Sequence, residues 1–360
     1  MAENRQSHYD AVIVGGGQAG LAAARLLKDA GLEIIVLDAG ERTGDSWRRR
    51  YHGLTLFTPR GYSGLAGMRM GGDPAHYPDK DEFADYLEAY AEHFRLPVRH
   101  GATVLSVIRK DGNQFVVAGT GFDTVAAAAV VVATGAFRDP IVPCWASELP
   151  PEVHALSAEA FGDGSHLPPG PLLVVGDGAS GRDIAMLARP KRDVVLATGR
   201  PRRLLPDRIL GRSLWWWLDV TGLVRAPTKS LRGQLMRRSD PFPDRGRRLS
   251  ELAAGGVQIK PRATGVAAGA VNFADGSSMQ PAAVVWAIGY RPDWSFLDIG
   301  TALGENNIVR HDNGISPVKG LYFLGLPWQR NRASGLVMGV SIDADVIVNR
   351  LLREHLASDR

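Results

Sequence analysis

The sequence feature that most constrains the fold is a glycine-rich turn that occurs twice, 161 residues apart in this 360-residue chain. The first copy, GGGQAG at 15–20, follows the apolar run AVIV and opens a segment with helical apolar spacing. The second copy, GDGASG at 176–181, follows LLVV in the same way. A strand that turns through such glycines into a helix begins a dinucleotide-binding unit. The sequence therefore predicts an α/β fold with two Rossmann-like domains.

Each glycine of the turn meets a physical requirement. The first forms a tight turn, the second lets the backbone approach a pyrophosphate, and the third lets the helix pack on the strand. The N-terminus of the helix then faces the phosphate charge. The residues expected at the two pyrophosphates are Gly15, Gly17, Gln18, Ala19 and Gly20 in the first copy, and Gly176, Gly178, Ala179, Ser180 and Gly181 in the second.

The ends of the two second strands differ in charge. Asp38 lies 23 residues after Gly15, where a carboxylate can accept hydrogen bonds from ribose hydroxyls. The equivalent position in the second copy is Gly199, and Arg200 follows it. A carboxylate at that position would repel a 2′-phosphate, whereas an arginine binds one through charge-assisted hydrogen bonds. The first copy is therefore predicted to bind FAD and the second NADPH, although Asp177 places an acidic residue near the second set of phosphates.

The rest of the chain suggests how the two units are connected. Apolar spacing predicts a helix at 18–29 and another at 344–355, and Asp79 with Glu82 forms a capping box for a third. The run LPPGP at 167–171 is interpreted as an interdomain linker. We therefore expect an FAD-binding domain of residues 1–141 plus 286–360, and an inserted NADPH-binding domain of residues 142–285.

Composition excludes several classes of protein. Cys144 is the only cysteine, which rules out a disulfide framework, a four-cysteine zinc site and a protein dithiol. We expect it to be a small filler of the core. No metal-ligand spacing and no catalytic triad or carboxylate pair stands out, as expected where a cofactor carries the chemistry. No apolar run approaches the roughly 18 residues of a membrane span, and the N-terminus is polar, so we expect a cytoplasmic protein without membrane partners.

The net charge of +4 is unevenly distributed. Arginines crowd two stretches of the chain. They are Arg200, Arg202 and Arg203 in one stretch, and Arg237, Arg238, Arg245, Arg247 and Arg248 in the other. These stretches are interpreted either as solvated faces or as sites that attract an anion such as a phosphate. No nucleic-acid-binding signature is visible, so nucleic acid is not an expected partner.

A whole-chain resemblance sharpens these expectations. It is carried by both glycine turns and by GDSWRRRY, LFTPRGYSGLAG, YPDKDEFADYLEAYAEHF, VVVATG, VVWAIGYRP and GLYFLGLPWQR. Over about residues 8–352, the chain resembles the class B flavin-dependent monooxygenases, including bacterial flavoproteins catalogued with metal or potassium transport. The segment 44–96 is similar to the plant flavin monooxygenases of auxin synthesis. The resemblance implies a glutathione-reductase-like two-domain flavoprotein with FAD, NADPH, and a peroxyflavin that oxygenates a small organic substrate at nitrogen, sulfur or a carbonyl carbon.

The resemblance also implies further site residues. Those that it places along the flavin or at the crossings between the domains are Trp47, Arg48, Ala133, Thr134, Gly135, Ala287, Ile288, Gly289, Trp328, Gln329 and Asp343. Arg48 and Arg332 are the candidates for orienting oxygen or substrate, and hence for a catalytic role.

Two departures from the family pattern keep other hypotheses open. For the family segment F-x-G-x-x-x-H-x-x-x-[YF], His154 is the only candidate, and its partner positions do not fit. Phe57 stands where animal members carry an asparagine. A second hypothesis is therefore an NADPH-dependent flavin reductase or oxidase without oxygen insertion, and a third is a non-catalytic dinucleotide sensor. The three tryptophans at 215–217 either pack a helix or line a substrate channel, and neither substrate nor oligomeric state is indicated.

Overall fold

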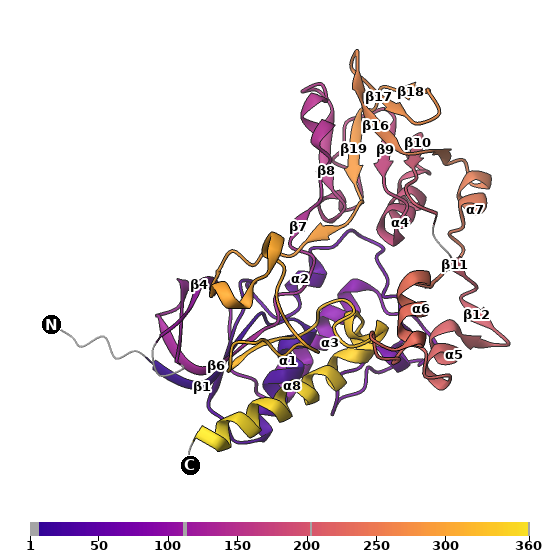
Figure 1. Cartoon of the computed structure of the whole chain (residues 1–360). Helices are drawn as coiled ribbons and strands as arrows, with labels where there is room; N and C mark the ends of the chain where they lie inside the picture. Colours follow the sequence, from indigo (N-terminus) through magenta and orange to yellow (C-terminus); the bar gives the residue numbers. More distant parts are fainter. Residues whose placement is uncertain (1–6, 111–113, 202–203, 359–360) are drawn as a thin grey trace.

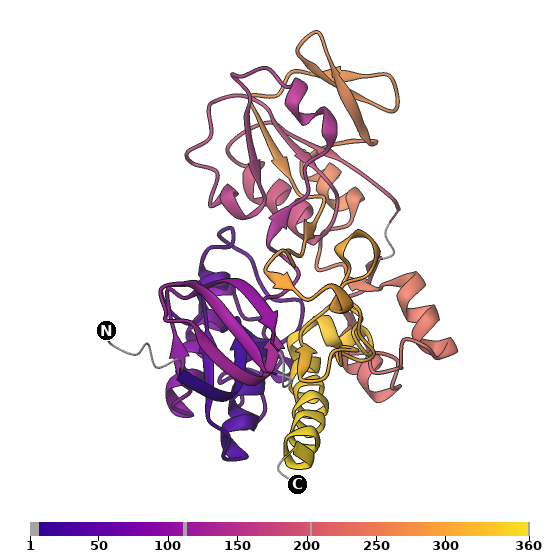
Figure 2. The ribbon, with the colours of Figure 1, turned by 60° about the vertical axis from the view of Figure 1, so that its left-hand side comes forward.

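The computed structural model describes residues 7–110, 114–201 and 204–358. Two units with parallel strands lie one above the other in Figures 1 and 2. The larger unit holds the first glycine turn and both ends of the described chain, and the smaller unit holds the second turn. This mixed α/β architecture with two Rossmann-like sheets confirms the predicted fold class.

The larger unit is built on an eight-stranded sheet. Its strands are β1 (Ser7–Val14), β2 (Ile34–Leu37), β3 (Val98–Arg99), β4 (Thr103–Arg109), β5 (Phe115–Thr120), β6 (Val125–Val132), β21 (Leu297–Asp298) and β22 (Leu321–Phe323). Their order is β21-β4-β5-β6-β1-β2-β3, with β22 also paired to β6. β1 pairs in parallel with both β2 and β6, whereas β4 and β5 form an antiparallel pair.

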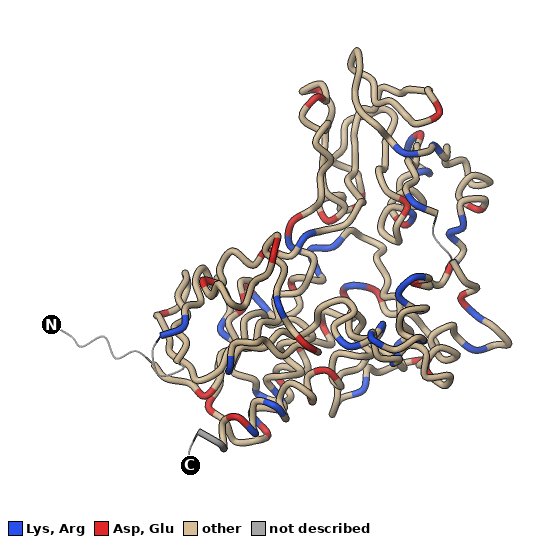
Figure 3. Tube along the Cα trace, viewed as in Figure 1, with Lys and Arg blue, Asp and Glu red and all other residues tan. Residues whose placement is uncertain are grey.

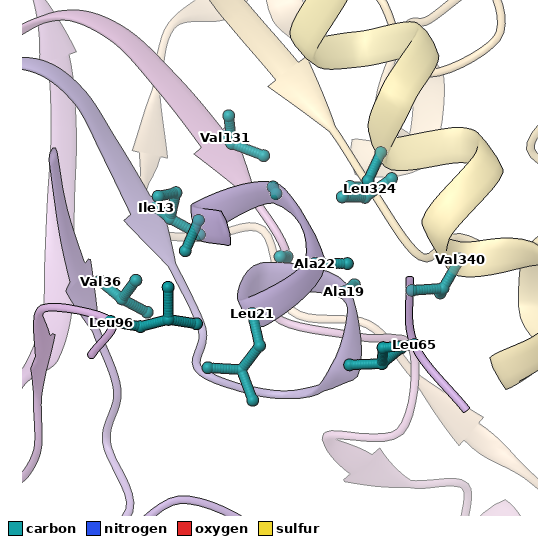
Figure 4. Close-up of a cluster of buried hydrophobic side chains, with 14 of the residues drawn as sticks. Ile13, Ala19, Leu21, Ala22, Val36, Leu65, Leu96, Val131, Leu324 and Val340 are labelled. Atoms are coloured by element: carbon teal, nitrogen blue, oxygen red, sulfur yellow. The ribbon is translucent and has the colours of Figure 1, made fainter. Parts of the chain in front are cut away.

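Helices cover this sheet and form its main core. They are α1 (Gln18–Asp29), α2 (Asp45–Arg48), α3 (Lys80–His93) and α8 (Val337–Ser358). In Figure 4, Leu21 and Ala22 of α1 lie between Ile13 of the sheet and Val340 of α8. α3 begins at the predicted capping box, because the side chain of Asp79 accepts from the backbone N–H of Glu82 and Glu82 accepts from that of Asp79.

The smaller unit is built on a five-stranded sheet that is parallel throughout. Its strands are β8 (His154–Ser157), β9 (Leu172–Val175), β10 (Val194–Ala197), β15 (Gln258–Lys260) and β19 (Ala283–Trp286), in the order β15-β10-β9-β19-β8. Helices α4 (Ala179–Ala188) and α7 (Leu249–Ala254) belong to the same part of the chain. A three-stranded meander, β16 (Ala263–Ala267), β17 (Ala270–Phe273) and β18 (Ser278–Met279), lies at the top of Figure 1.

The interpretation of 167–171 as an interdomain linker is wrong. This run lies between β8 and β9, which are both strands of the smaller sheet. Prolines and glycine mark a turn equally well within a domain and between domains, so their composition alone does not separate the two cases.

A strand pair and an inserted side chain are two of the contacts between the units. β7 (Asp139–Pro140) pairs antiparallel with β20 (Tyr290–Arg291), where the chain crosses from one unit to the other and back. Tyr51 follows α2 of the larger unit, yet it is only 3% exposed and packs in the core of the smaller unit. The backbone N–H of His52 donates to the carbonyl of Gly162 at 2.8 Å beside it. The larger unit thus contributes a side chain to the core of the smaller.

Residues 204–243 leave the smaller sheet and pack on the larger unit. They contain β11 (Leu204–Leu205), β12 (Arg208–Ile209), β13 (Arg212–Ser213), β14 (Phe242–Pro243) and the helices α5 (Leu214–Val220) and α6 (Leu231–Ser239). Trp215 of α5 is fully buried against Leu336 and Met338 at the start of α8. Lys and Arg recur along this segment in Figure 3. The boundaries 142–285 of the inserted domain stay a prediction.

Short 3-10 helices complete the fold. They are η1 (Arg60–Tyr62), η3 (Cys144–Glu148), η4 (Glu159–Phe161), η5 (Gly300–Ala302), η6 (Glu305–Asn307) and η7 (Arg332–Gly335). Cys144 begins η3 and is exposed, so its expected role as a core filler is wrong. A small apolar side chain is compatible with either location, and only the tertiary structure places it.

Candidate functional site

Close backbone contacts shape the first glycine turn. Gly15 has φ +103°, and a Cβ on it would lie 2.6 Å from the carbonyl oxygen of Ala133 at the end of β6. A Cβ on Gly20 would lie 1.9 Å from the carbonyl oxygen of Gly15. Gly17 has nothing within 4 Å of its Cβ position and is the N-cap of α1, where no side chain caps the helix. The turn therefore leaves backbone N–H groups of α1 open to an anion.

Asp38 lies beside this turn at the end of β2. Its carboxylate accepts hydrogen bonds from the backbone N–H of Gly16 at 2.5 Å and of Gly40 at 2.7 Å. The two bonds fix the orientation of the carboxylate, and each oxygen retains a lone pair. Asp38 is half-buried, so its carboxylate is in part accessible from outside the protein.

Gln18 and Trp47 contact each other across the turn. The indole Nε1 of Trp47 donates to Oε1 of Gln18 at 3.2 Å, and its ring meets that of Phe83 edge to face at 4.9 Å. Ala19 and Gly20 are buried in the first turn of α1. The structure thus brings Trp47 next to the predicted pyrophosphate residues.

Arg48 has a different environment from its neighbour. Its guanidinium donates to Asp85 at 2.7 Å, to Glu88 at 2.6 Å and to the carbonyl of Thr43 at 2.7 Å. Burial alone would lower the pKa of Arg48, but the two carboxylates of α3 outweigh it and raise the pKa. This geometry favours a role in holding α2 on α3 over contact with oxygen or substrate.

The second glycine turn repeats the geometry of the first. Gly176 has φ +106°, and a Cβ on it would lie 2.5 Å from the carbonyl oxygen of Ala287, just after β19. A Cβ on Gly181 would lie 1.8 Å from the carbonyl oxygen of Gly176. Gly178 is the N-cap of α4 and, like Gly17, has no side-chain cap. Ala179 and Ser180 form the first turn of α4.

In the second turn the carboxylate belongs to the turn itself, whereas in the first it belongs to the end of the neighbouring strand. Oδ1 of Asp177, in the turn, accepts from the backbone N–H of Gly199 at 3.0 Å, and Oδ2 accepts from Arg182 at 3.0 Å. Asp177 is only 4% exposed and is neutralised by Arg182. Arg200 is exposed, while Arg202 and Arg203 lie outside the described residues. The carboxylate of Asp177 therefore lies beside Gly199, the residue that precedes the exposed Arg200, and its charge is balanced by Arg182.

A cleft opens at the N-terminus of α4. Its cavity volume is about 50 Å³, and Phe57 of the larger unit forms part of its wall. The charged residues that line it are Asp177, Arg182, Asp183, Asp244, Arg245 and Arg247. Gly178 and Ala179 contribute the start of the helix.

Asp183 joins both units at this cleft. Its carboxylate accepts from the hydroxyl of Tyr51 at 2.9 Å and forms an ion pair with Arg247 at 2.5 Å. Burial raises the pKa of Asp183, and the charge of Arg247 opposes that rise. Burial also raises the pKa of Tyr51, so its hydroxyl is protonated and donates to Asp183. The cleft wall is thus cross-linked to the larger unit.

A third group of predicted residues lies where η7 leads into α8. Trp328 has φ +59°, a left-handed conformation that is rare for tryptophan. Gln329 is 3% exposed and accepts from the backbone N–H of Leu326 at 3.3 Å. Asp343 is 1% exposed and pairs with Arg330 at 3.0 Å, and its burial raises its pKa. A Cβ on Gly325, just before this group, would lie 2.9 Å from Ala19, so the third group adjoins the first turn.

Arg332 is enclosed by aromatic rings. Its guanidinium lies 4.8 Å from the ring centroid of Phe242, 5.6 Å from Trp328 and 5.8 Å from Trp215. Its Nε is 2.9 Å from a carboxylate oxygen of Asp240, and burial lowers its pKa. Trp215 is fully buried, which favours the packing interpretation of this tryptophan.

Sequence reasoning missed the residues that cross-link the cleft. Tyr51 and Asp183 carry no local pattern that marks them, because they bond each other across 132 positions of the chain. Arg182 bonds Asp177 nearby as well as the distant carbonyl of Arg247. Arg245 and Arg247 did give a signal, since they belong to a basic stretch that is compatible with anion attraction.

Within 7–110, 114–201 and 204–358, no helix is long and apolar enough to cross a membrane. In the same ranges, no group of three or more His, Cys, Asp or Glu side chains is arranged to hold a metal ion.

Comparison with known proteins adds family information to this geometry. Residues 12–203 match the family described as pyridine nucleotide-disulphide oxidoreductase. An uncharacterized CzcO-like oxidoreductase of Geobacillus kaustophilus is 39% identical over 96% of this chain and 99% of its own length. The indole-3-pyruvate monooxygenase YUCCA1 of Oryza sativa is 28% identical over 93% of this chain and 89% of its own. The solved flavin-containing monooxygenase of Stenotrophomonas maltophilia is similar in fold, with TM-score 0.78, 24% identity, and coverage of 97% and 99% of the two chains.

Proposed function

We propose that this chain, which belongs to the pyridine nucleotide-disulphide oxidoreductase family, is an NADPH-consuming monooxygenase of a small organic molecule. Its relatives place it among the flavin monooxygenase-like oxidoreductases of that family. FAD and NADPH are the cofactors that the family implies. The observation that carries the proposal is the pair of glycine turns, equal in backbone geometry and opposite in charge at the ribose end.

The first turn fits FAD. The open space at Gly17 and the uncapped N-terminus of α1 suit a pyrophosphate, and the fixed carboxylate of Asp38 suits the adenosine ribose. Trp47 and Gln18 would lie along the same nucleotide. When bound, FAD supplies the chemistry that passes electrons from NADPH to oxygen.

The second turn fits a phosphorylated dinucleotide. Gly178 offers uncapped N–H groups, Gly199 places no carboxylate at the ribose, and Arg200 is exposed beside it. Asp177 would not repel a phosphate strongly, because Arg182 neutralises it. These contacts support NADPH over NADH.

The reaction that this proposal requires is balanced by its two co-substrates. NADPH, a proton, oxygen and the substrate give NADP⁺, water and the substrate with one added oxygen atom. The protein must keep bulk water from the reacting atoms. We propose the buried Gln329 and Arg332 and the half-buried Trp328, all near α8, for that task.

The substrate is proposed only as a class. The plant relative is named for indole-3-pyruvate, which is a small organic acid with a carbonyl group. At 28% identity, that name supports a small organic substrate and no closer assignment. Arg332 would contact an anionic substrate only if Asp240 gave up its ion pair.

Coupled turnover tests this proposal. Purified protein loaded with FAD is given NADPH and oxygen with a panel of amines, sulfides, ketones and keto acids. NADPH oxidation that yields a product one oxygen atom heavier supports the monooxygenase. NADPH oxidation that yields only hydrogen peroxide with every substrate contradicts oxygen insertion.

One observation favours the second candidate, a reductase or oxidase without oxygen insertion. His154, the only match to the family's histidine segment, is exposed on β8, the edge strand of the smaller sheet. In that position it is poorly placed to serve a nucleotide at the second turn. The hydrogen peroxide result above would support this candidate, whereas protein that binds no flavin and oxidises no NADPH would support the sensor hypothesis.

A further inference from the structure

Arg245 differs from the other arginines in the cleft. It lies between α6 and α7 with φ +47°, a left-handed backbone that is costly for a residue with a side chain. Its guanidinium donates to the carbonyls of Thr55 and Leu56, each at 3.4 Å, and to the hydroxyl oxygen of Thr55. It also lies 5.3 Å from the ring centroid of Tyr77. All these partners are neutral and belong to the larger unit.

The neighbouring arginines have anionic partners. Arg182 pairs with Asp177 and Arg247 pairs with Asp183. Among the described residues, Arg245 forms no ion pair with a carboxylate, although it lines the cleft and burial lowers its pKa. Arg245 is half-buried, and the charges of Asp183 and Asp207 offset only part of the effect of burial, which lowers its pKa. An anion that enters the cleft would therefore stabilise its positive charge further.

The other wall of the same cleft also attracts anions. Gly178 and Ala179 line it, and they begin a ten-residue helix whose first N–H groups have no side-chain cap. A helix N-terminus carries partial positive charge, and free backbone donors suit phosphate oxygens. The cleft therefore has hydrogen-bond donors for an anion on two sides, from α4 of the smaller unit and from Arg245 anchored on the larger, although three aspartates and three arginines line it.

We propose that Arg245 is a second pyrophosphate-binding residue, which contacts the diphosphate of the pyridine dinucleotide from the side opposite α4. This inference rests on the proposed function, because it takes the dinucleotide as the anion. The reported bonds use three of the five guanidinium N–H groups, which leaves donors for a phosphate. Since the same side chain is bonded to Thr55 and Leu56, bound dinucleotide is held by both units at once.

The pyrophosphate assignment makes a distinctive prediction for the two nicotinamide dinucleotides. NADPH and NADH share the diphosphate and differ only at the 2′ position. Arg245→Gln is therefore expected to raise the dissociation constants of NADPH and NADH by the same factor. For the loss of a charge-assisted contact this factor is about tenfold to hundredfold. Arg245→Lys keeps the charge and is expected to recover part of the affinity.

The test is anaerobic reduction of the FAD-loaded protein over a range of NADPH and NADH concentrations, which gives a dissociation constant for each. Arg237→Gln is the matched control, because Arg237 is exposed on α6. Thermal unfolding without nucleotide shows whether each variant is folded. If Arg245→Gln is folded and binds both dinucleotides normally, or loses affinity for NADPH alone, the proposal is wrong.

The same experiment separates this inference from the proposed function. If neither NADPH nor NADH reduces the wild-type protein, the proposed function fails, and binding of inorganic pyrophosphate measured by calorimetry still tests the site. Weaker pyrophosphate binding by Arg245→Gln than by Arg237→Gln supports the anion site, and equal binding by the two variants overturns it.

Discussion

The hydrogen bond between Asp177 and Gly199 reverses the roles of turn and strand end in the hydrogen bond between Asp38 and Gly16. In the first turn a carboxylate at the strand end accepts from the turn backbone, and in the second a carboxylate in the turn accepts from the strand-end backbone. In each unit one aspartate thus joins the glycine turn to the end of the second strand. The aspartate belongs to the strand end in the first unit and to the turn in the second. The exchange leaves no carboxylate side chain at Gly199, after the second strand, and it keeps the hydrogen bond that joins the strand end to the turn.

Arg200 is predicted to select the phosphorylated dinucleotide. Arg200→Ala should raise the KM for NADPH about 10- to 100-fold and leave the KM for NADH nearly unchanged, because a charged contact to the 2′-phosphate is worth about 1.5–3 kcal/mol. Steady-state kinetics with both nucleotides measure the effect, and Arg238→Ala on α6 serves as an exposed control. Equal changes for NADPH and NADH would place the 2′-phosphate elsewhere.

Asp38 is predicted to retain FAD. Asp38→Ala should weaken FAD binding about tenfold or more, since it removes a charged acceptor and frees the N–H groups of Gly16 and Gly40. The ratio of flavin to protein absorbance after dialysis measures the loss. Asp10→Ala is the control, because Asp10 also accepts from a backbone N–H, that of Glu33, away from the turn. Full flavin content in Asp38→Ala would show that this carboxylate does not hold the cofactor.

Gly20 is predicted to be intolerant of a methyl group. A Cβ there would meet the carbonyl oxygen of Gly15 at 1.9 Å, so Gly20→Ala must shift α1 away from β1. We expect a loss of about 1–3 kcal/mol in the free energy of unfolding, measured by urea denaturation. Gly300→Ala, where nothing lies within 4 Å of the added atom, should be nearly neutral. Equal stability of the two variants would contradict the close helix–strand contact.

Tyr86 is predicted to make stability fall at high pH. Burial raises its pKa to about 12, and its hydroxyl donates to the carbonyl of Met68 at 2.7 Å. An unfolded tyrosine loses its proton near pH 10. The contribution of the neutral phenol is therefore complete below about pH 10 and is lost as the pH rises towards about 12. Denaturant titrations between about pH 10 and about pH 12 should show that the free energy of unfolding falls less steeply with pH in Tyr86→Phe than in the wild type. If the two proteins lose stability in parallel, Tyr86 does not have the raised pKa.

Local pattern predicted the parts of the fold that local chemistry determines. Helix α1 follows from apolar spacing between glycines, and α3 follows from the capping box at Asp79, because both signals lie within the element itself. The two turns were recognisable because their glycines are required by contacts that span only a strand, a turn and a helix. The matched geometry of Gly15 and Gly176 bears out that part of the reasoning.

The parts that were not predicted depend on contacts between distant residues. Residues 204–243 pack on the larger unit through Trp215 and Met338, which are 123 positions apart in sequence. The hydrogen bond from Tyr51 to Asp183 spans 132 positions, and no local spacing announces it. The same limit applies to Cys144, whose side chain suits either a core or a surface until its neighbours are known.

The burial of Tyr51 limits how such proteins can be recombined. Consider a chimaera that joins residues 142–285 of one relative to the remainder of another. The core of its smaller unit would then receive the residue at position 51 from the other parent. Such a chimaera would also replace the hydroxyl of Tyr51 that bonds Asp183. A recombination that keeps these contacts must therefore be discontinuous and transfer the smaller sheet together with the short segment around Tyr51.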